Sequence, residues 1–447
     1  MSLKLTSYKG TRDLYPVDMA ERNYIFAGWR KVVESYGYQE YMTPLLEPIE
    51  MYAAKSGQEI VNDQTYSFVD RGSRQMTIRP EMTPSVSRLV AAKRQDLPMP
   101  ARLYSIANFM RYERPQHGRE REFWQLNFDL FGIDNIQAEL EIIEMSNDIL
   151  TSFGASKDMF TIKVNDRRLT DHIMREYLAL DGDQTPMLIK LLDRFDKLPA
   201  IVFEEQAKQI LCGDLAKLEK FKSLLMVKTI DDLPGAMSTA DITKPLRDLL
   251  AKLHQNGISN AIYDIKLMRG FDYYTGIVFE VFDEAPENRR AMFGGGRYDG
   301  LVSLFGVESL PVVGVAPGET TFREFLIAHK LLPDFTASCG PDVTILPLTH
   351  EQNDQAMAIA KTIRSVGITV SVDYTDRKID KKTRVAVKNK AKLVVYLGES
   401  EIASGKITVK DLGTGWQEQI AADDLPGYLR LKCLTSVAND KDNSEEE

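Results

Sequence analysis

Apolar and polar side chains alternate strictly between residues 124 and 130, which is the period of a β-strand with two different faces. The apolar face comprises Trp124, Leu126, Phe128 and Leu130. The opposite face comprises Phe123, Gln125, Asn127 and Asp129. Another extended run precedes this strand, across a loop rich in Arg, Pro and Gly. The pattern predicts a long antiparallel hairpin over residues 109–132.

The polar face of this hairpin is a candidate binding surface. Arg111 and Glu113 on the incoming strand can share it, beside a loop that holds further arginines. The face then combines two carboxylates, two amides, a guanidinium and an aromatic ring. The alternative is a half-buried strand with its polar side in water. A ligand with a purine ring, a phosphate and an ammonium group suits this face better than water does.

Longer patterns divide the chain into parts. Residues 1–164 mix helical and extended runs, whereas residues 165–259 consist mostly of short helical runs. Apolar residues in the helical part recur every three or four positions, and the part contains no cluster of catalytic side chains. Extended runs resume over residues 260–331.

A domain boundary is predicted at residues 331–342, LLPDFTASCGPD, which combine two prolines, a glycine and small polar residues. Beyond it strands alternate with helices. The predicted strands are 343–348, 368–374 and 392–398, and the predicted helices are 352–366 and 381–392. This alternation predicts a compact α/β domain over residues 340–430 with a partly parallel sheet. The acidic residues 431–447 are predicted to be disordered.

Five segments together resemble the motifs of the histidyl-tRNA synthetases, a family of class II aminoacyl-tRNA synthetases. The predicted hairpin closely resembles motif 2, with the sequence FMRYERPQHGREREFWQLNFDLFG. The other four are similar to motif 1 (YGYQEYMTPLLEP, 36–48), the segment that holds the substrate amino group (TIRPEMTPS, 77–85), the histidine signature (MRGFDYYTGIVFE, 268–280) and the glycine-rich segment after it (GGGRYDGL, 294–301). They follow the family's order and approximate spacing over most of the chain.

The resemblance implies an α+β catalytic domain with a central antiparallel sheet, a helical insertion and a C-terminal α/β anticodon-binding domain. The implied activity is ATP-dependent ligation of L-histidine to tRNA(His) through histidyl-adenylate, by a homodimer. Mg2+ would accompany ATP, and no tightly bound protein metal is expected. Two alternatives are a regulatory subunit of ATP phosphoribosyltransferase and a tRNA-binding protein without activation. The regulatory paralogue generally lacks the anticodon-binding domain, which is present here.

Activation joins a carboxylate to the α-phosphate of ATP, and planar cations suit the charge that develops on the phosphate oxygens. By resemblance, the catalytic residues are Arg111, which grips the α-phosphate, and Arg269, which holds that phosphate with the substrate carboxylate. Glu113 would read the adenine amino group, and Phe123 would stack on the ring. The residues expected to reach the outer phosphates or the tRNA acceptor end are Arg119 and Arg121.

Recognition of histidine requires partners for both ring nitrogens, because a neutral imidazole offers one N–H donor and one lone pair. The resemblance assigns this role to Asp129 and Tyr274. The residues that match those around the substrate ammonium are Glu81, Thr83 and Gln125. The other residues expected in the histidine pocket are Tyr273, Tyr298 and Gly294 to Gly296.

Motif 3 departs from the family pattern. It normally ends in a Gly-Leu-Glu-Arg run whose arginine covers the outer face of adenine, but this chain has VVGVAPGETTFREFL. With Gly318 aligned, Thr320 and Thr321 occupy the Glu-Arg positions. Arg323 lies two residues further on, about 200° around a helix, so it cannot simply replace the missing side chain. The sequence leaves open another cation over adenine, a weaker ATP site or a loss of activation.

Net charge and cysteine spacing bear on partners and compartment. The 447 residues have a net charge of −9, so a tRNA partner requires local basic patches. Residues 377–392 carry eight Lys or Arg against one acid, although a solvated helix face is the alternative. The residues predicted to contact tRNA are Gln116, Lys381, Lys382, Arg384 and Lys388. Three widely spaced cysteines and the lack of an apolar leader or membrane span favour a cytoplasmic protein.

Overall fold

The computed structural model describes residues 4–53, 64–116, 118–268, 273–288, 291–336 and 339–442, with side chains as far as residue 433 except that of Asp196. The chain forms two compact units. The first comprises Met1–Asp13 and Glu21–Pro333, and the second comprises Leu14–Ala20 and Asp334–Glu447.

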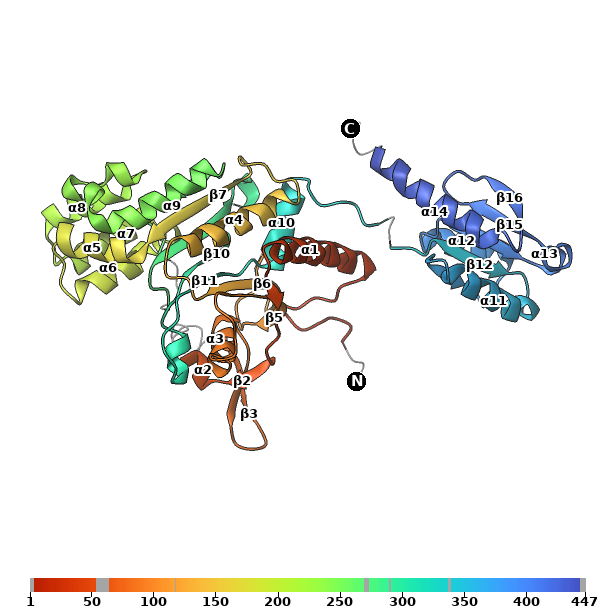
Figure 1. The fold of residues 1–447 in the computed structure, drawn as a ribbon, viewed down its shortest axis with the longest axis horizontal. Helices are drawn as coiled ribbons and strands as arrows, with labels where there is room; N and C mark the ends of the chain where they lie inside the picture. The colour runs from red at the N-terminus through yellow and green to blue at the C-terminus, as the bar shows by residue number, and fades with distance from the viewer. Residues whose placement is uncertain are drawn as a thin grey trace. The chain divides into compact units, whose positions relative to one another are not determined.

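An eight-stranded sheet forms the centre of the first unit (Figure 1). In spatial order its strands are β1 (Gln39–Glu40), β5 (Ala101–Met110), β6 (Glu122–Phe131), β11 (Val312–Val315), β10 (Ala291–Arg297), β9 (Ile277–Asp283), β7 (Phe160–Asp166) and β8 (Ala261–Tyr263). Neighbouring strands from β5 to β7 are antiparallel, whereas the edge pairs β1–β5 and β7–β8 are parallel. The expected antiparallel sheet is therefore present, extended by a parallel strand at each edge.

Strands β5 and β6 form the predicted hairpin, but β5 ends at Met110, so Arg111 and Glu113 lie in the loop and not on the incoming strand as expected. They pair from Ala101 opposite Phe131 to Met110 opposite Glu122. The apolar residues of the alternating run pack into the large core on one face of the sheet, and they are Trp124, Leu126, Phe128 and Leu130. Phe123 packs against a second core on the other face. The two faces predicted from the alternation are confirmed.

Three helices cover the face of the sheet that carries Leu126, and they are α1 (Pro16–Ser35), α4 (Gln137–Thr151) and α10 (Glu319–Ala328) (Figure 1). The rings of Trp29 on α1 and Phe322 on α10 have centroids 5.3 Å apart. The Leu126 N–H donates to the Pro317 carbonyl oxygen at 2.9 Å. This contact places the start of α10 directly beside β6.

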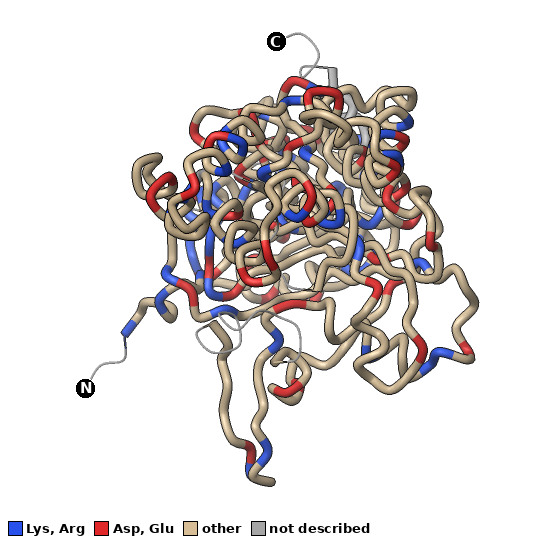
Figure 2. Tube along the Cα trace, turned by 90° about the vertical axis from the view of Figure 1, so that its left-hand side faces the viewer, with Lys and Arg blue, Asp and Glu red and all other residues tan. Residues whose placement is uncertain are grey.

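Helix α3 (Thr83–Ala92) packs on the second core, which contains Val86, Phe109 and Tyr298. A small antiparallel sheet consists of β2 (Leu46–Pro48), β4 (Gln75–Ile78) and β3 (Tyr66–Val69), with helix α2 (Glu50–Ala53) after β2. The β3–β4 hairpin projects from the body of the unit, and its tip carries acidic and basic residues (Figures 1 and 2).

The part between β7 and β8 is helical, as the sequence predicts. Its helices are α5 (Arg167–His172), α6 (Gln184–Leu192), α7 (Ala200–Ile210), α8 (Leu215–Leu225) and α9 (Lys244–Gln255). Its shorter turns are η2 (Ile173–Tyr177), η3 (Phe195–Lys197), η4 (Ile230–Asp232), η5 (Gly235–Thr239) and η6 (Asp241–Thr243). Phe203, Phe221 and Leu249 join the large core. Two further turns of the unit are η7 (Pro286–Asn288) and η8 (Val302–Phe305).

The second unit has a five-stranded sheet of β13 (Val370–Val372), β12 (Val343–Pro347), β14 (Leu393–Leu397), β15 (Lys406–Asp411) and β16 (Gln417–Ala421). The first three strands are parallel and the last two antiparallel. The accompanying helices are η9 (His350–Gln352), α11 (Asn353–Arg364), α12 (Ile379–Lys388), α13 (Glu399–Ser404) and α14 (Leu425–Asp442). The predicted α/β domain with a partly parallel sheet is confirmed.

Helix α14 corrects one prediction. Residues 431–442, expected to be disordered, continue this helix, while residues 443–447 lie outside the described part of the chain. Leu425 and Leu429 are buried in the core of the unit, and no Pro or Gly interrupts the chain between Tyr428 and Asp442. An anchored first turn therefore lets the helix continue through residues 431–442, which carry two Lys and two Asp. Among the described residues, no helix is long and apolar enough to cross a membrane.

Candidate active site

A cavity of about 160 Å³ opens between the β5–β6 hairpin and the start of α10. Its lining residues are Arg111, Glu113, Gly118, Arg119, Glu120, Phe123, Trp124, Gln125, Met292, Gly318, Thr320 and Thr321. Four of the five residues predicted to bind ATP are among them, and these are Arg111, Glu113, Arg119 and Phe123. The structure therefore brings together most of the side chains that the motif 2 resemblance selects.

Arg111, Arg119 and Glu113 lie close together in the lining of this cavity. The Arg111 Nε donates to the Pro80 carbonyl oxygen at 2.9 Å, and its guanidinium carbon lies 5.2 Å from the centre of the Phe123 ring. Glu113 lies 3.8 Å from Arg111 and 3.2 Å from Arg119. A planar cation held next to an aromatic ring suits a phosphate that lies beside its base.

Arg121 is placed differently from the expectation that it reaches phosphates. Its guanidinium carbon lies 4.1 Å from the centre of the Tyr112 ring, and Nη1 donates to the Tyr8 hydroxyl at 2.7 Å. Its Nε donates to the Glu113 carbonyl oxygen at 3.1 Å. Arg121 is buried, and it is absent from the lining of the cavity as far as the chain is described. These contacts fasten the N-terminal segment to the hairpin loop.

The buried carboxylate of Asp129 lies further along the same face of β6. The Tyr298 hydroxyl donates to its Oδ1 at 2.5 Å, and Oδ2 has no hydrogen-bond partner among the described residues. Burial raises the pKa of Asp129 to about 7, and the hydrogen bond from Tyr298 opposes this shift. The resemblance pairs Asp129 with Tyr274 around the ligand, but the hydroxyl that meets Asp129 directly is that of Tyr298.

Two residues that the sequence interpretation missed complete this pocket. Tyr41 is buried, and no hydrogen-bond partner for its hydroxyl exists in the described part of the chain. Burial, followed by the charge of Asp129, raises the pKa of Tyr41 well above its usual value. Gly314 pairs with Asp129 across β11 and β6, and a Cβ there would lie 1.9 Å from Oδ1. In the sequence, a glycine inside an apolar strand is the feature that indicates a close approach at Gly314.

Glu81 and Tyr273 adjoin the Asp129 pocket. The Tyr273 hydroxyl donates to the buried Glu81 carboxylate at 3.1 Å, and the rings of Tyr273 and Tyr298 have centroids 5.7 Å apart. Thr83 begins α3 two residues after Glu81, and Gln125 lines the cavity. Glu81, Tyr273, Tyr274, Tyr298 and Asp129 are therefore linked by direct contacts. The predicted catalytic residue Arg269 lies outside the described residues.

The glycine-rich segment belongs to a strand. Gly294 to Gly296 lie within β10, opposite β9 on one side and β11 on the other. A Cβ at Gly295 would lie 2.2 Å from the Gly314 carbonyl oxygen, and one at Gly296 would lie 2.7 Å from that of Ile277. Glycine is required here because the neighbouring backbones approach closely.

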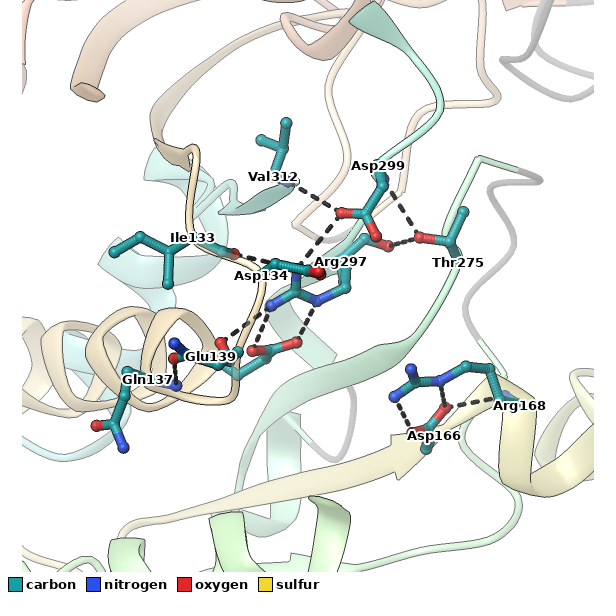
Figure 3. A network of polar contacts seen from close by, with 11 residues as sticks. Ile133, Asp134, Gln137, Glu139, Asp166, Arg168, Thr275, Arg297, Asp299 and Val312 are labelled. Atoms are coloured by element: carbon teal, nitrogen blue, oxygen red, sulfur yellow. Dashed lines mark hydrogen bonds and ion pairs between the residues drawn. The ribbon is translucent and has the colours of Figure 1, made fainter. Parts of the chain in front are cut away.

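A buried ion pair holds the end of β10 in place (Figure 3). The Arg297 Nε donates to Glu139 at 2.6 Å, and its Nη2 donates to the second oxygen of that carboxylate at 2.8 Å. Asp299 accepts a hydrogen bond from the Val312 N–H at 3.0 Å. Arg297 and Asp299 flank Tyr298 in sequence. The network therefore fixes the backbone that presents the Tyr298 hydroxyl to the pocket.

Two threonines line the cavity where motif 3 would place Glu and Arg. The Thr320 hydroxyl donates to Glu120 at 3.3 Å, and the Thr321 hydroxyl donates to the Met292 carbonyl oxygen at 2.9 Å. The Arg323 Nε donates to Glu21 at 2.6 Å. As its position two residues further along the helix predicts, Arg323 pairs with Glu21 and does not replace the motif 3 arginine.

The predicted tRNA contacts fall into exposed and buried groups. On α12 the exposed cations are Lys381, Arg384 and Lys388. Lys382 is buried, and its ammonium donates to the carbonyl oxygens of Pro347 at 2.7 Å and Asp373 at 3.1 Å. The prediction is wrong for Lys382, because its position faces the sheet together with Ala386. Gln116 is exposed in the hairpin loop of the first unit.

Comparison with known proteins agrees with this geometry. A family model described as histidyl-tRNA synthetase matches residues 10–317, and one described as an anticodon binding domain matches residues 342–432. A histidine–tRNA ligase from Leptospira biflexa is 40% identical over 418 residues, covering 92% of this chain and 94% of its own. One from Opitutus terrae is 36% identical over 431 residues, covering 95% and 98%.

A solved structure supports the fold. The histidyl-tRNA synthetase from Nostoc sp. PCC 7120 is 20% identical, with a TM-score of 0.78 over 96% of this chain and 100% of that one. It shows the fold alone, which is that of the class II synthetases. The matches in sequence extend over nearly the whole chain and include both units. The chain belongs to the histidyl-tRNA synthetase family.

Proposed function

We propose that this chain ligates L-histidine to tRNA(His) with ATP, through a histidyl-adenylate. The observation that supports this most is the arrangement along β6. Phe123 and Gln125 line the cavity, and the buried Asp129 follows on the same face of the strand. One rigid strand thus carries groups suited to a nucleotide and a group suited to an imidazole.

In the first step, a carboxylate oxygen of histidine forms a bond to the α-phosphorus of ATP, and pyrophosphate leaves. Arg111 is held by the Pro80 carbonyl oxygen beside Phe123, where its guanidinium can stabilise the charge on the α-phosphate. Arg269 would share this task, as the resemblance implies. A ribose hydroxyl of the terminal adenosine of the tRNA then takes the histidyl group and releases AMP. Positioning and electrostatics carry both steps, without a covalent protein intermediate.

Mg2+ is expected to enter with ATP. The described residues include no group of three or more His, Cys, Asp or Glu side chains placed to hold a metal ion. The carboxylates of Glu113 and Glu120 line the cavity and are oxygen ligands of the kind that Mg2+ accepts. When bound, the ion would neutralise phosphate charge.

Histidine recognition would use the unpaired groups of the Asp129 pocket. A ring N–H can donate to Asp129 Oδ2, and the other ring nitrogen can accept from a tyrosine hydroxyl such as that of Tyr41. Glu81, which accepts from Tyr273, adjoins this pocket and suits the substrate ammonium. An amino acid without both ring nitrogens would leave these buried groups unpaired, which costs about 1–3 kcal/mol for each group.

Partners and compartment follow the same proposal. Gln116 and the exposed cations of α12 would contact tRNA. In the motif 1 segment Met42, Leu45 and Leu46 are exposed apolar side chains, which supports burial in a homodimer. The three cysteines are thiols rather than disulfides, which fits a cytoplasmic protein.

Histidine-dependent exchange of labelled pyrophosphate into ATP tests the proposal. The wild-type protein should catalyse exchange with L-histidine and Mg2+. Arg111→Ala should reduce the rate roughly a hundredfold or more while melting like the wild type, since it removes a charge-assisted clamp from the reacting phosphate. A regulatory subunit or a purely tRNA-binding protein predicts no exchange by the wild type, and that result would contradict the proposal.

A further inference from the structure

One wall of the proposed ATP site lacks the cation that the motif 3 arginine normally supplies. That wall is the start of α10, where Thr320 and Thr321 stand in place of the motif 3 Glu and Arg. The Thr321 hydroxyl donates to a backbone carbonyl, and Arg323 is paired with Glu21. A cation on this side of the cavity must therefore come from another segment.

Arg12, in the segment before α1, reaches this wall. Its Nε lies 2.9 Å from Glu120 Oε1, and its Nη2 lies 3.5 Å from Glu319 Oε1. Glu120 lines the cavity and also accepts a hydrogen bond from Thr320. Glu120 therefore contacts both Arg12 and Thr320, the residue at the position of the motif 3 glutamate. The Arg12 side chain is 31% exposed and contacts Glu120, which lines the cavity, although Arg12 itself is not among the lining residues of the described chain.

The backbone that carries Arg12 is fixed to the hairpin. The Arg121 N–H donates to the Gly10 carbonyl oxygen at 2.7 Å, and the Arg121 side chain donates to the Tyr8 hydroxyl at 2.7 Å. Gly10 has a φ of +86°, and a Cβ there would lie 2.8 Å from both Arg121 and Pro115. Glycine is therefore required at this position, and Arg121 serves to hold the segment that delivers Arg12.

Arg22 is the other arginine near this wall, but it is already engaged. Its Nη2 lies 3.3 Å from Glu319, its guanidinium carbon lies 5.6 Å from the centre of the Trp124 ring, and its side chain is 12% exposed. Arg22 also balances the buried charge of Glu319. Arg12 can therefore turn from Glu319 toward a ligand without leaving that carboxylate unpaired.

We propose that Arg12 supplies the cation that motif 3 lacks, contacting bound ATP from the α10 side of the cavity, with Glu120 as its positioning residue. This inference rests on the proposed function. A guanidinium over the face of adenine would stabilise the base by a cation–π contact. Phe123 lines another part of the same cavity. The cation would then come from a segment that is far from motif 3 in the sequence but lies beside it in the fold.

Calorimetric titration with ATP and Mg2+ tests this inference on the full-length protein. Arg12→Ala should weaken ATP binding about tenfold, the size of a favourable cation–π contact. In pyrophosphate exchange the KM for ATP should rise by a similar factor, while the KM for histidine stays within about twofold, because Arg12 faces only the nucleotide. Arg12→Met keeps most of the side-chain volume, so it should fold like the wild type and show the same loss. The double variant Arg12→Ala/Thr321→Arg should recover affinity by restoring the motif 3 cation.

Two arginines serve as matched controls. Arg323 on α10 pairs with Glu21, and Arg30 on α1 pairs with Glu40 at 3.1 Å on the surface. Arg323→Ala and Arg30→Ala should leave ATP affinity unchanged. Unchanged ATP affinity in Arg12→Met, equal weakening in Arg323→Ala, or a double variant that binds no better than Arg12→Ala would each overturn the inference. Failure of the proposed function would differ, since it would show as a wild type without histidine-dependent exchange.

Discussion

Asp129 becomes charged only at a cost in free energy, because its carboxyl is buried and Oδ2 lacks a hydrogen-bond partner within the described chain. An imidazole N–H that donates to this oxygen would remove part of that cost. Under the proposed function, the pocket would select its ligand through an unpaired buried group, which discriminates more strongly than apolar fit. At the scale of single residues, the proposal therefore assigns specificity to Asp129, to the hydroxyls around it and to the space that Gly314 leaves.

The titration of Asp129 gives a first prediction. In the ligand-free protein, Asp129→Asn should become progressively more stable than the wild type as the pH rises from about 5 to about 7. The pKa of this carboxyl rises from 3.8 to about 7 on folding, so the folded state holds the proton more tightly. That stabilisation is complete below the unfolded pKa and is lost between about pH 4 and about pH 7, by about 1.4 kcal/mol per unit, after which the difference levels off. Asparagine does not titrate.

Thermal melting of both proteins across this pH range measures the difference. A difference in melting temperature that stays constant with pH would show that Asp129 is not a buried titrating carboxyl. A difference of the opposite sign, in which the wild type gains on the variant as the pH rises, would show that the folded protein stabilises the charged form.

The space beside Asp129 gives a second prediction. Gly314→Ala should raise the KM for histidine roughly tenfold or more and lower stability by about 1–3 kcal/mol, because the added methyl would overlap Asp129 Oδ1. The KM for ATP should change little. Gly300→Ala is the control, since a Cβ there meets nothing within 4 Å. Equal increases in both KM values, measured by pyrophosphate exchange, would show that Gly314 supports the sheet as a whole and not the histidine pocket.

At the scale of elements, hydrophobic period predicted more than charge did. The alternation along β6 gave both faces of the hairpin, because burial of one face fixes the register of a strand. Arg121 and Lys382 were misplaced, because the sequence does not show whether a cation faces solvent or neighbouring carbonyl groups and rings. The residue spacing along α12 does indicate that Lys382 is buried. Lys382 lies three residues after Ile379 and four before Ala386, both on the packed side of the helix.

Helix α12 gives a third prediction. Replacing Lys381, Arg384 and Lys388 together by Gln should weaken charging of tRNA(His) and reduce its dependence on salt, because fewer counterions are released from the RNA. Pyrophosphate exchange should not change, since it needs no tRNA. Aminoacylation at two salt concentrations, compared with exchange, measures both effects.

A charge-matched control separates this effect from net charge. Gln at Lys361, Lys406 and Arg430, three exposed cations of the same unit on other elements, should affect charging less. Equal losses in the two triple variants would mean that overall charge, and not the α12 surface, binds tRNA. Loss of exchange in the α12 variant would indicate damage to the fold.

At the scale of the whole molecule, the sequence predicted a catalytic domain, a helical insertion and a C-terminal α/β domain, because the order of the motifs and the alternation of strands and helices follow directly from the sequence. It did not show which distant segments meet. Tyr41, Asp129 and Tyr298 come from three different motifs and converge only when the sheet forms. Arg12 reaches the motif 3 wall in the same way. Such contacts depend on how β6, β10, β11 and α1 pack together. This packing cannot be predicted from the pattern of any short stretch of sequence.

The charging of tRNA tests the central claim most directly, because it requires the nucleotide cavity, the histidine pocket and the tRNA-binding surface at once. The purified protein would be incubated with ATP, Mg2+, a tRNA(His) transcript and labelled amino acid, and acid-insoluble label would be counted. The account predicts that histidine is transferred to this tRNA and that other amino acids are not, and that Asp129→Ala loses charging at low histidine concentration. Absence of histidine transfer by the folded wild-type protein, or equal transfer of another amino acid, would contradict it.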